Sequence, residues 1–156
     1  MTDARRVLYT AEAHVTGGRA EGHGRTSDGA LEVDLRVPVE MGGSGGGTNP
    51  EQLIAVGWAA CFESALGAIG RRRRRDVGDV AIDSRMMLVP TPDRGYNLAA
   101  ELHVTLPSVD DPAEAEALVR AAHEVCTYSN ATRGNVDVLI TVNGRDIDEP
   151  PHVVAA

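Results

Sequence analysis

The feature that most constrains the fold is one long apolar segment near the middle of the chain. It opens with Asn49-Pro50-Glu51-Gln52, in which the asparagine can cap a helix, the proline suits the first helical position and the glutamine can complete a capping box. Large apolar side chains then fall on nearly every side: Leu53, Ile54, Val56, Trp58, Phe62, Leu66 and Ile69. A stripe of small residues accompanies them: Gly57, Ala60, Cys61, Ser64 and Ala68. We therefore predict a helix from Pro50 to about Gly70 that is buried almost all round.

Alternating apolar residues predict strands before and after this helix along the chain. We expect three antiparallel strands before it and three strands after it, at residues 7–15, 19–27, 31–37, 80–89, 96–106 and 136–142. Gly17-Gly18 and Asp28-Gly29 predict hairpin turns that enclose a polar strand. A second helix is predicted from the capping signature at Asp111-Pro112 to about Cys126. Residues 127–135 are expected to form a loop, and the tail from Gly144 to be loosely ordered. The order βββ-α-ββ-α-β predicts an α+β fold with antiparallel sheets around a buried central helix.

Length and charge limit the partners of such a fold. The 156 residues suit a single domain, which we place at residues 1–143, with a C-terminal tail at residues 144–156. The net charge of -8 disfavours binding to nucleic acid and to anionic membrane surfaces. The run from Arg71 to Arg75 is expected to be a solvated helix end. No apolar leader opens the chain, and the apolar run 53–62 is about half of a membrane span, so we expect a soluble, cytoplasmic protein.

Two other patterns are weak. Gly42-Gly43-Ser44-Gly45-Gly46 matches the serine-hydrolase elbow, but the helix begins too late for that motif, so these glycines are expected to allow close backbone approach. His123-x-x-Cys126 has the spacing of metal ligands, but no second pair completes a tetrahedral set. We therefore expect no metal site.

The two cysteines are the strongest candidates for chemistry. Cys61 lies about three turns into the apolar helix, where burial raises a thiol pKa, so a small buried core cysteine is one interpretation. A cation beside the sulfur would overturn that interpretation. Cys126 lies at the predicted end of the second helix, beside a polar loop. One buried thiol and one at a flexible helix end are typical of an attacking and resolving pair, in which a sulfenic acid is captured as a disulfide.

Several motifs around these residues resemble a known family. The three main ones are Thr48-Asn49-Pro50-Glu51-Gln52-Leu53, Gly57-Trp58-Ala59-Ala60-Cys61-Phe62 and Val125-Cys126-Thr127-Tyr128-Ser129-Asn130-Ala131-Thr132-Arg133-Gly134-Asn135. Others are Leu8-Tyr9-Thr10-Ala11, Thr16-Gly17-Gly18-Arg19, Ser27-Asp28-Gly29 and the glycine-rich loop. On these motifs the chain resembles the Ohr/OsmC family, specifically its organic hydroperoxide resistance (Ohr) branch, over about residues 7–143. The arginine run and the tail from Gly144 lie outside the resemblance.

The resemblance implies a role for each of four residues. Cys61 corresponds to the family's peroxidatic cysteine and Cys126 to its resolving cysteine. Arg19 matches the arginine that contacts the reactive sulfur, and Glu51 matches the carboxylate that holds this arginine. Thr127 departs from the pattern, because Ohr proteins usually carry proline after the resolving cysteine. The loss of that rigid φ is expected to loosen the segment around Cys126 and to affect the rate of disulfide closure.

The resemblance also implies a fold and an activity. The expected protein is an intertwined homodimer with two active sites at the subunit interface. It would be a thiol-dependent peroxidase that reduces alkyl and fatty-acid hydroperoxides to alcohols in defence against oxidative stress. It would hold no metal, haem or other bound cofactor, and a dithiol, in particular lipoyl groups on partner proteins, would reduce it again.

Two other functions remain open from the sequence. One is a peroxidase of the OsmC branch, with the same chemistry but other substrates and reductants. The other is a non-enzymatic redox sensor or small-ligand-binding dimer. For the peroxidase, apolar residues are expected to form a wall that favours alkyl hydroperoxides over hydrogen peroxide: Met41, Trp58, Phe62 and Met86 or Met87.

Overall fold

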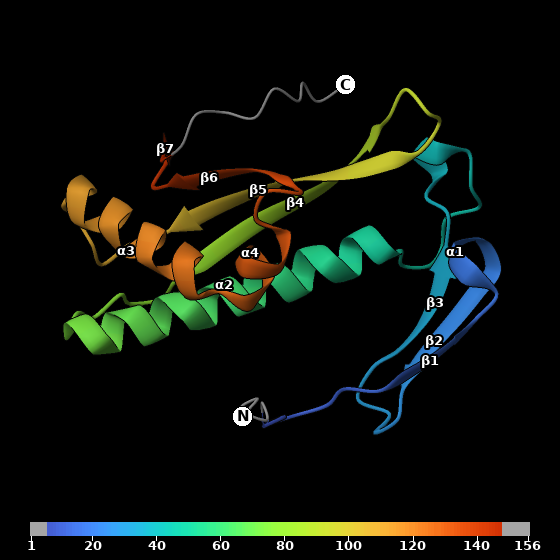
Figure 1. Cartoon of the computed structure of the whole chain (residues 1–156), viewed down its shortest axis with the longest axis horizontal. Helices are drawn as coiled ribbons and strands as arrows, with labels where there is room; N and C mark the ends of the chain where they lie inside the picture. The colour runs from blue at the N-terminus through green and yellow to red at the C-terminus, as the bar shows by residue number, and fades with distance from the viewer. Residues whose placement is uncertain (1–5, 148–156) are drawn as a thin grey trace, which may run out of the picture. The chain divides into compact units, whose positions relative to one another are not determined.

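The computed structural model describes residues 6–147, and these form two compact units that divide between Pro50 and Glu51. Each unit is described by itself. Figure 1 shows the elements of both, with the strands β1 to β3 in the N-terminal unit and the longest helix, α2, opening the C-terminal unit. The expected α+β class with antiparallel sheets and a central helix is confirmed. Most of the tail predicted at residues 144–156 lies outside the described residues.

The N-terminal unit is built on an antiparallel sheet of three strands in the order β1-β2-β3. These strands are β1 (Ala13–Thr16), β2 (Gly22–Thr26) and β3 (Glu32–Arg36). The turn between β2 and β3 contains Gly29 at φ 71°, a conformation that glycine adopts without strain. The meander predicted from the alternation pattern is therefore confirmed.

Two details of this unit differ from the prediction. The first strand was expected over residues 7–15, but β1 begins only at Ala13, because β2 offers partners to Ala13–Thr16 alone. The connection at Gly17-Gly18 was expected to be a simple hairpin turn, and it contains instead one helical turn, α1 (Gly18–Glu21). Both departures arise from pairing and turn geometry, which an alternation pattern does not encode.

The glycine-rich loop follows a 3-10 turn, η1 (Val39–Met41). A Cβ atom on Gly43 would lie 2.1 Å from the carbonyl oxygen of Val37, a distance that no side chain tolerates. The expected close backbone approach in this loop is confirmed at that position. We find no strand-to-helix elbow here, since α2 begins only at Pro50.

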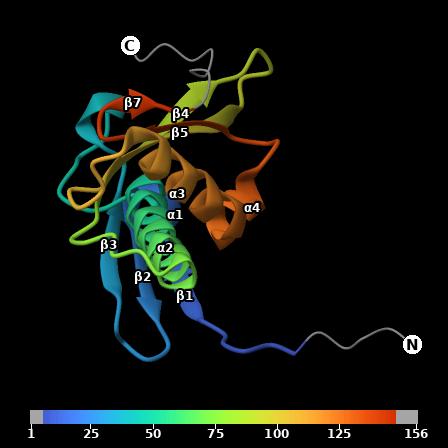
Figure 2. The same cartoon turned by 90° about the vertical axis from the view of Figure 1, so that its left-hand side faces the viewer.

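The C-terminal unit is a four-stranded sheet with helices on one face. Its elements are α2 (Pro50–Arg73), β4 (Ala81–Pro90), β5 (Tyr96–Thr105), α3 (Pro112–Val125), α4 (Thr127–Thr132), β6 (Asp137–Val142) and β7 (Arg145–Asp146). The strand order is β4-β5-β6-β7. Only β5 and β6 are parallel, because the chain crosses between them through α3 and α4. Figure 2 shows α2 and α3 on the same side of this sheet.

The core of this unit fills the space between the helices and the sheet. Its buried side chains are almost all aliphatic, as the 3% aromatic content requires. From the helices they include Trp58, Phe62, Leu66, Leu118 and Val119, and from the sheet Leu102, Val104 and Ile140. Asp111 caps α3 by accepting a hydrogen bond of 3.0 Å from the backbone N–H of Ala113, as predicted.

The helix α2 is less buried than predicted. Its core face is covered, but Val56 on the other face keeps 72% of its surface exposed. Among residues 6–147, α2 is also the one helix whose length and composition would let it cross a membrane, a property that core helices of soluble proteins share. Its buried face packs against the sheet of its own unit, as expected of such a core helix.

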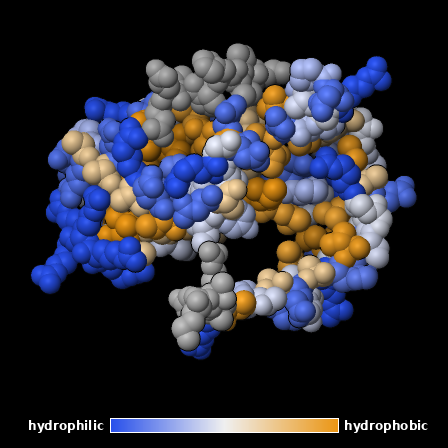
Figure 3. All heavy atoms as spheres, in the orientation of Figure 1, coloured by the Kyte–Doolittle hydropathy of each residue, from blue (hydrophilic) through white to orange (hydrophobic). Residues whose placement is uncertain are grey.

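The arginine run ends α2 three residues later than predicted. Arg71, Arg72 and Arg73 form the last helical turn, and all five arginines are exposed to solvent, as expected. Figure 3 shows hydrophilic atoms gathered where α2 ends. In addition, Arg75 donates a bidentate pair of hydrogen bonds to Glu114 at the start of α3. This contact fixes the end of α2 to the next helix.

The segments expected to be irregular are partly ordered. Residues 127–135 were predicted to form a loop, but Thr127–Thr132 form α4. Beyond Gly144, Arg145 pairs with Val142 of β6. The side chain of Ile147 is buried in the core. The prediction of a loosely ordered tail is therefore wrong for residues 144–147, because they complete the sheet edge and bury an apolar side chain.

Candidate active site

The two thiols lie beside each other. Cys61 lies on α2, and Cys126 occupies the junction where α3 ends and α4 begins. The Sγ atom of Cys126 lies 3.5 Å from the Sγ atom of Cys61 and donates a hydrogen bond to it. Both cysteines are free thiols. Since a disulfide needs about 2.05 Å between the sulfurs, a small approach would join them.

Hydrogen-bond donors converge on the sulfur of Cys61. The Oγ1 atom of Thr127 lies 3.0 Å from it, and the backbone N–H groups of Tyr128 and Thr127 also point to it. Burial raises the pKa of Cys61, but these hydrogen bonds, the hydroxyl of Thr127 foremost, outweigh burial and bring the pKa below its usual value. Donors of this kind favour the thiolate, which is the nucleophilic form.

Cys126 has the opposite environment. Its side chain is 1% exposed, and burial raises the pKa of Cys126, with the nearby charge of an ionised Cys61 adding to the effect. The sequence suggested a buried Cys61 and an accessible Cys126, and this assignment of burial is wrong. Cys61 is half-buried on the rim of the core, whereas the α3–α4 junction turns Cys126 inward.

The α3–α4 junction is held against α2 by three contacts. The indole Nε1–H of Trp58 donates a hydrogen bond of 3.3 Å to Oγ of the buried Ser129. The rings of Trp58 and Tyr128 stack with their centroids 6.5 Å apart. A Cβ atom on Gly57 would lie 3.0 Å from the Tyr128 hydroxyl oxygen, so the glycine lets Tyr128 approach the helix closely. These contacts set the distance between the two sulfurs.

Sequence reasoning missed the parts that Thr127, Tyr128 and Ser129 play. All three lie in the motif that carried the family resemblance, but nothing in their pattern shows which helix they contact.

Of the residues predicted to form the apolar wall, Trp58 and Phe62 are fully buried side chains of the core. Met41 belongs to the N-terminal unit and keeps nearly half of its surface exposed.

The other two predicted site residues, Arg19 and Glu51, each lie near the start of a helix. Arg19 belongs to α1 in the N-terminal unit, next to Gly17 and Gly18 in the left-handed conformation. Glu51 lies in the first turn of α2. The pairing of Arg19 with Glu51 and the approach of Arg19 to Cys61 stay predictions.

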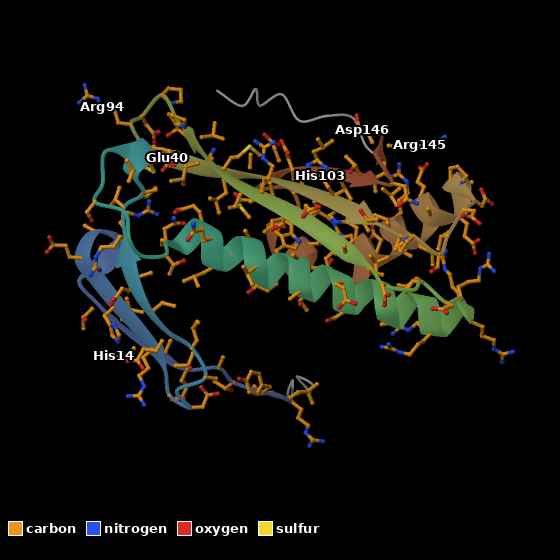
Figure 4. The ribbon with its side chains drawn as sticks, turned by 180° about the vertical axis from the view of Figure 1, so that it is seen from behind. His14, Glu40, Arg94, His103, Arg145 and Asp146 are labelled. Atoms are coloured by element: carbon orange, nitrogen blue, oxygen red, sulfur yellow. The ribbon has the colours of Figure 1, made fainter. Side chains whose placement is uncertain are left out.

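A second polar cluster lies on the sheet away from the thiols. Glu101 on β5 accepts hydrogen bonds from Arg85 at 2.9 Å and from His103 at 3.0 Å. Leu102 lies between Glu101 and His103 on β5 and faces the core. The side chains of Glu101 and His103 therefore point to the opposite side of the sheet, where Figure 4 shows His103. In the described part of the chain, no group of three or more His, Cys, Asp or Glu side chains is placed to hold a metal ion.

The fold and this thiol pair define the class of protein. Residues 42–141 match the family model of OsmC-like proteins, and the chain belongs to this Ohr/OsmC family. A curated relative from Xanthomonas axonopodis pv. citri, named organic hydroperoxide resistance protein, is 48% identical over 91% of this chain and 99% of its own length. The relative OhrB from Bacillus subtilis is 42% identical over 86% of this chain and 97% of its own length.

Solved structures agree with these relatives. An organic hydroperoxide resistance protein from Legionella pneumophila superposes with a TM-score of 0.84 at 50% identity, covering 88% of this chain and 98% of its own. One from Vibrio cholerae, with captopril bound in one of its active sites, has a TM-score of 0.85 at 38% identity, covering 94% and 99%. The resemblance to the Ohr branch inferred from the motifs is therefore confirmed.

Proposed function

We propose that this protein defends the cell against organic hydroperoxides as a thiol-dependent peroxidase of the Ohr type. The observation that carries the proposal is the pair of sulfurs 3.5 Å apart, of which Cys61 has a lowered pKa and Cys126 a raised pKa. The names of the relatives, which refer to organic hydroperoxide resistance, support the substrate class. Alkyl and fatty-acid hydroperoxides are the proposed substrates.

The first half of the reaction oxidises Cys61. Its thiolate attacks the distal oxygen of the hydroperoxide, so an S–O bond forms while the O–O bond breaks. The alkoxide takes a proton and leaves as the alcohol, and Cys61 becomes a sulfenic acid. In the second half, the sulfur of Cys126 attacks the sulfur of Cys61, hydroxide leaves and is protonated to water, and a disulfide remains.

Arg19 and Glu51 are proposed to assist the first half. A guanidinium against Cys61 would stabilise the thiolate and polarise the bound peroxide, and a carboxylate would hold the guanidinium through a bidentate pair. In this role Arg19 adds to the hydrogen bonds that already favour the thiolate of Cys61.

A dithiol must complete the cycle. It supplies two electrons to the Cys61–Cys126 disulfide and becomes a disulfide itself, and lipoyl groups on partner proteins are the proposed donors. No bound cofactor takes part in the proposed cycle. We further propose that the protein works as a homodimer in the cytoplasm, without binding nucleic acid or membranes.

The test follows thiols and peroxide together. Reduced full-length protein mixed with one equivalent of cumene hydroperoxide should lose both thiols and the mass of two hydrogens. The variant Cys61→Ser should consume no peroxide, whereas Cys126→Ser should gain one oxygen on Cys61, which dimedone then traps. Survival of both thiols in the parent protein, or peroxide consumption by Cys61→Ser at the parental rate, would contradict the proposal.

The reductant separates the remaining alternatives. With excess hydroperoxide and dihydrolipoamide, an Ohr-type peroxidase turns over many times. An OsmC-branch enzyme would prefer other substrates and thiols in the same comparison. A redox sensor would be oxidised once per chain and would not turn over.

A further inference from the structure

Thr127 occupies an unusual place in the site. It is the first residue of α4 and directly follows Cys126. Its Oγ1 atom lies 3.0 Å from the sulfur of Cys61, which is nearer than the sulfur of Cys126 at 3.5 Å. The contact joins residues that lie 66 positions apart in the sequence, so it depends on the packing of α4 against α2.

The direction of this hydrogen bond depends on the state of Cys61. Between a neutral thiol and a hydroxyl either group can donate. Once Cys61 is ionised, its sulfur carries no proton, so the hydroxyl of Thr127 must be the donor. Hydrogen bonds to a charged acceptor are about twice as strong as those between neutral groups. The contact therefore favours the thiolate over the thiol.

A purely structural role for the hydroxyl fits the geometry less well. A threonine at a helix start often caps the helix, but the N-cap of α4 is Cys126. In the same helix, Thr132 shows the ordinary structural use, because its hydroxyl donates to the backbone carbonyl oxygen of Tyr128 at 2.8 Å. The hydroxyl of Thr127 points instead to a reactive sulfur.

We propose that Thr127 is a catalytic residue of this protein, whose hydroxyl donates a hydrogen bond to the Cys61 thiolate and holds that sulfur next to Cys126. A proline at this position would supply neither this hydroxyl nor the backbone N–H that also reaches the sulfur. The inference rests on the proposed function only in naming Cys61 as the attacking residue. The segment that carries Cys126 thus also carries a hydrogen-bond donor to the thiolate of Cys61.

The test measures the reactivity of Cys61 without peroxide. Because Cys126 titrates beside Cys61, all proteins carry Cys126→Ser, and the rate of alkylation by iodoacetamide is recorded from pH 5 to pH 10. Thr127→Val removes the hydroxyl and keeps the shape, and it should slow alkylation at pH 6 about tenfold, as the loss of a hydrogen bond to a charged group predicts. Above the pKa of Cys61 its rate should equal or exceed that of the parent, because a more basic thiolate is more nucleophilic.

Two matched variants complete the design. Thr127→Ser keeps a hydroxyl and should retain most of the parental rate at pH 6, and Thr132→Val removes the hydroxyl that contacts only backbone and should leave the profile unchanged. The proposal is overturned if the Thr127→Val profile superimposes on the parent, if Thr127→Ser is as slow as Thr127→Val, or if Thr127→Val is equally slow at every pH. Because alkylation needs no hydroperoxide, a protein without peroxidase activity would contradict the proposed function and leave this result standing.

Discussion

At the scale of single residues, the two thiols differ in the direction of their pKa. Hydrogen bonds to the sulfur of Cys61 overcome its burial, whereas burial dominates at Cys126. As the pH rises, the thiolate of Cys61 therefore forms first, at a lower pH than in an ordinary thiol. The thiolate of Cys126 forms last, at a higher pH.

This difference predicts the order in which the thiols react. Reduced protein treated with limiting iodoacetamide at pH 7 should carry the label on Cys61, and label on Cys126 should appear only at a pH above the usual range of thiol pKa values. Peptide mass spectrometry after increasing times gives the two rates. Equal rates at pH 7, or faster labelling of Cys126, would show that the environments are not as described.

At the scale of elements, α4 keeps a backbone that suits proline although it begins with threonine. Cys126 has φ -63° and ψ 126°, the extended conformation that proline favours in the residue before it. Thr127 stands at the first helical position, where the missing N–H of proline disturbs no helical hydrogen bond. The expected loosening around Cys126 is therefore not accompanied by a lost helix.

Thr127→Pro should consequently separate stability from reactivity. The rigid φ should raise the free energy of unfolding by about 0.5 kcal/mol through the unfolded state, and urea denaturation measures this gain. The same change removes two donors from the sulfur of Cys61 and should slow its alkylation at pH 6. A variant that gains stability and also reacts faster would contradict the role assigned to these donors.

The position of α4 also depends on the buried contact between Trp58 and Ser129. Ser129→Ala leaves the indole N–H of Trp58 without its acceptor inside the core, which should cost about 1–3 kcal/mol of unfolding free energy. The control is Ser64→Ala, because the hydroxyl of Ser64 is exposed and bonds only to the carbonyl oxygen of Ala60 at 2.9 Å. Urea denaturation should show a change within about 0.5 kcal/mol for this control, and equal losses in both variants would refute the argument.

Local signals in the sequence predicted most of the elements and the antiparallel meander, but not the pairing of strands that are far apart in the chain. The start of α2 at Pro50 and the cap of α3 at Asp111 follow from capping residues, and the strands follow from alternation. The parallel pairing of β5 with β6 could not be read from alternation, because it is set by the crossover through α3 and α4. The contact between Thr127 and Cys61 could not be predicted for the same reason, because tertiary packing brings together segments that are distant in the sequence.

At the scale of the whole molecule, each of the two units exposes apolar surface that its own packing does not cover. Val56 on α2 keeps 72% of its surface exposed, and Val7, Leu8 and Tyr9 are exposed as well. Residues 7–12 have the alternating pattern of a strand but form none in their own unit. The intertwined homodimer proposed above would account for both features, since a second copy could cover the helix face and pair with the segment that forms no strand.

The proposed dimer predicts a molecular mass and the effect of changing one side chain. Light scattering after gel filtration should give twice the 16.5 kDa of the chain. Val56→Lys would place a charge in the covered face, at the cost of an unpaired buried ammonium, and should shift the protein to monomers and reduce peroxide turnover. Ala117→Lys, on the exposed side of α3, adds the same charge and should remain a fully active dimer. A parent protein of 16.5 kDa at micromolar concentration would contradict the dimer. A Val56→Lys variant that stays dimeric would show that Val56 does not lie in the interface.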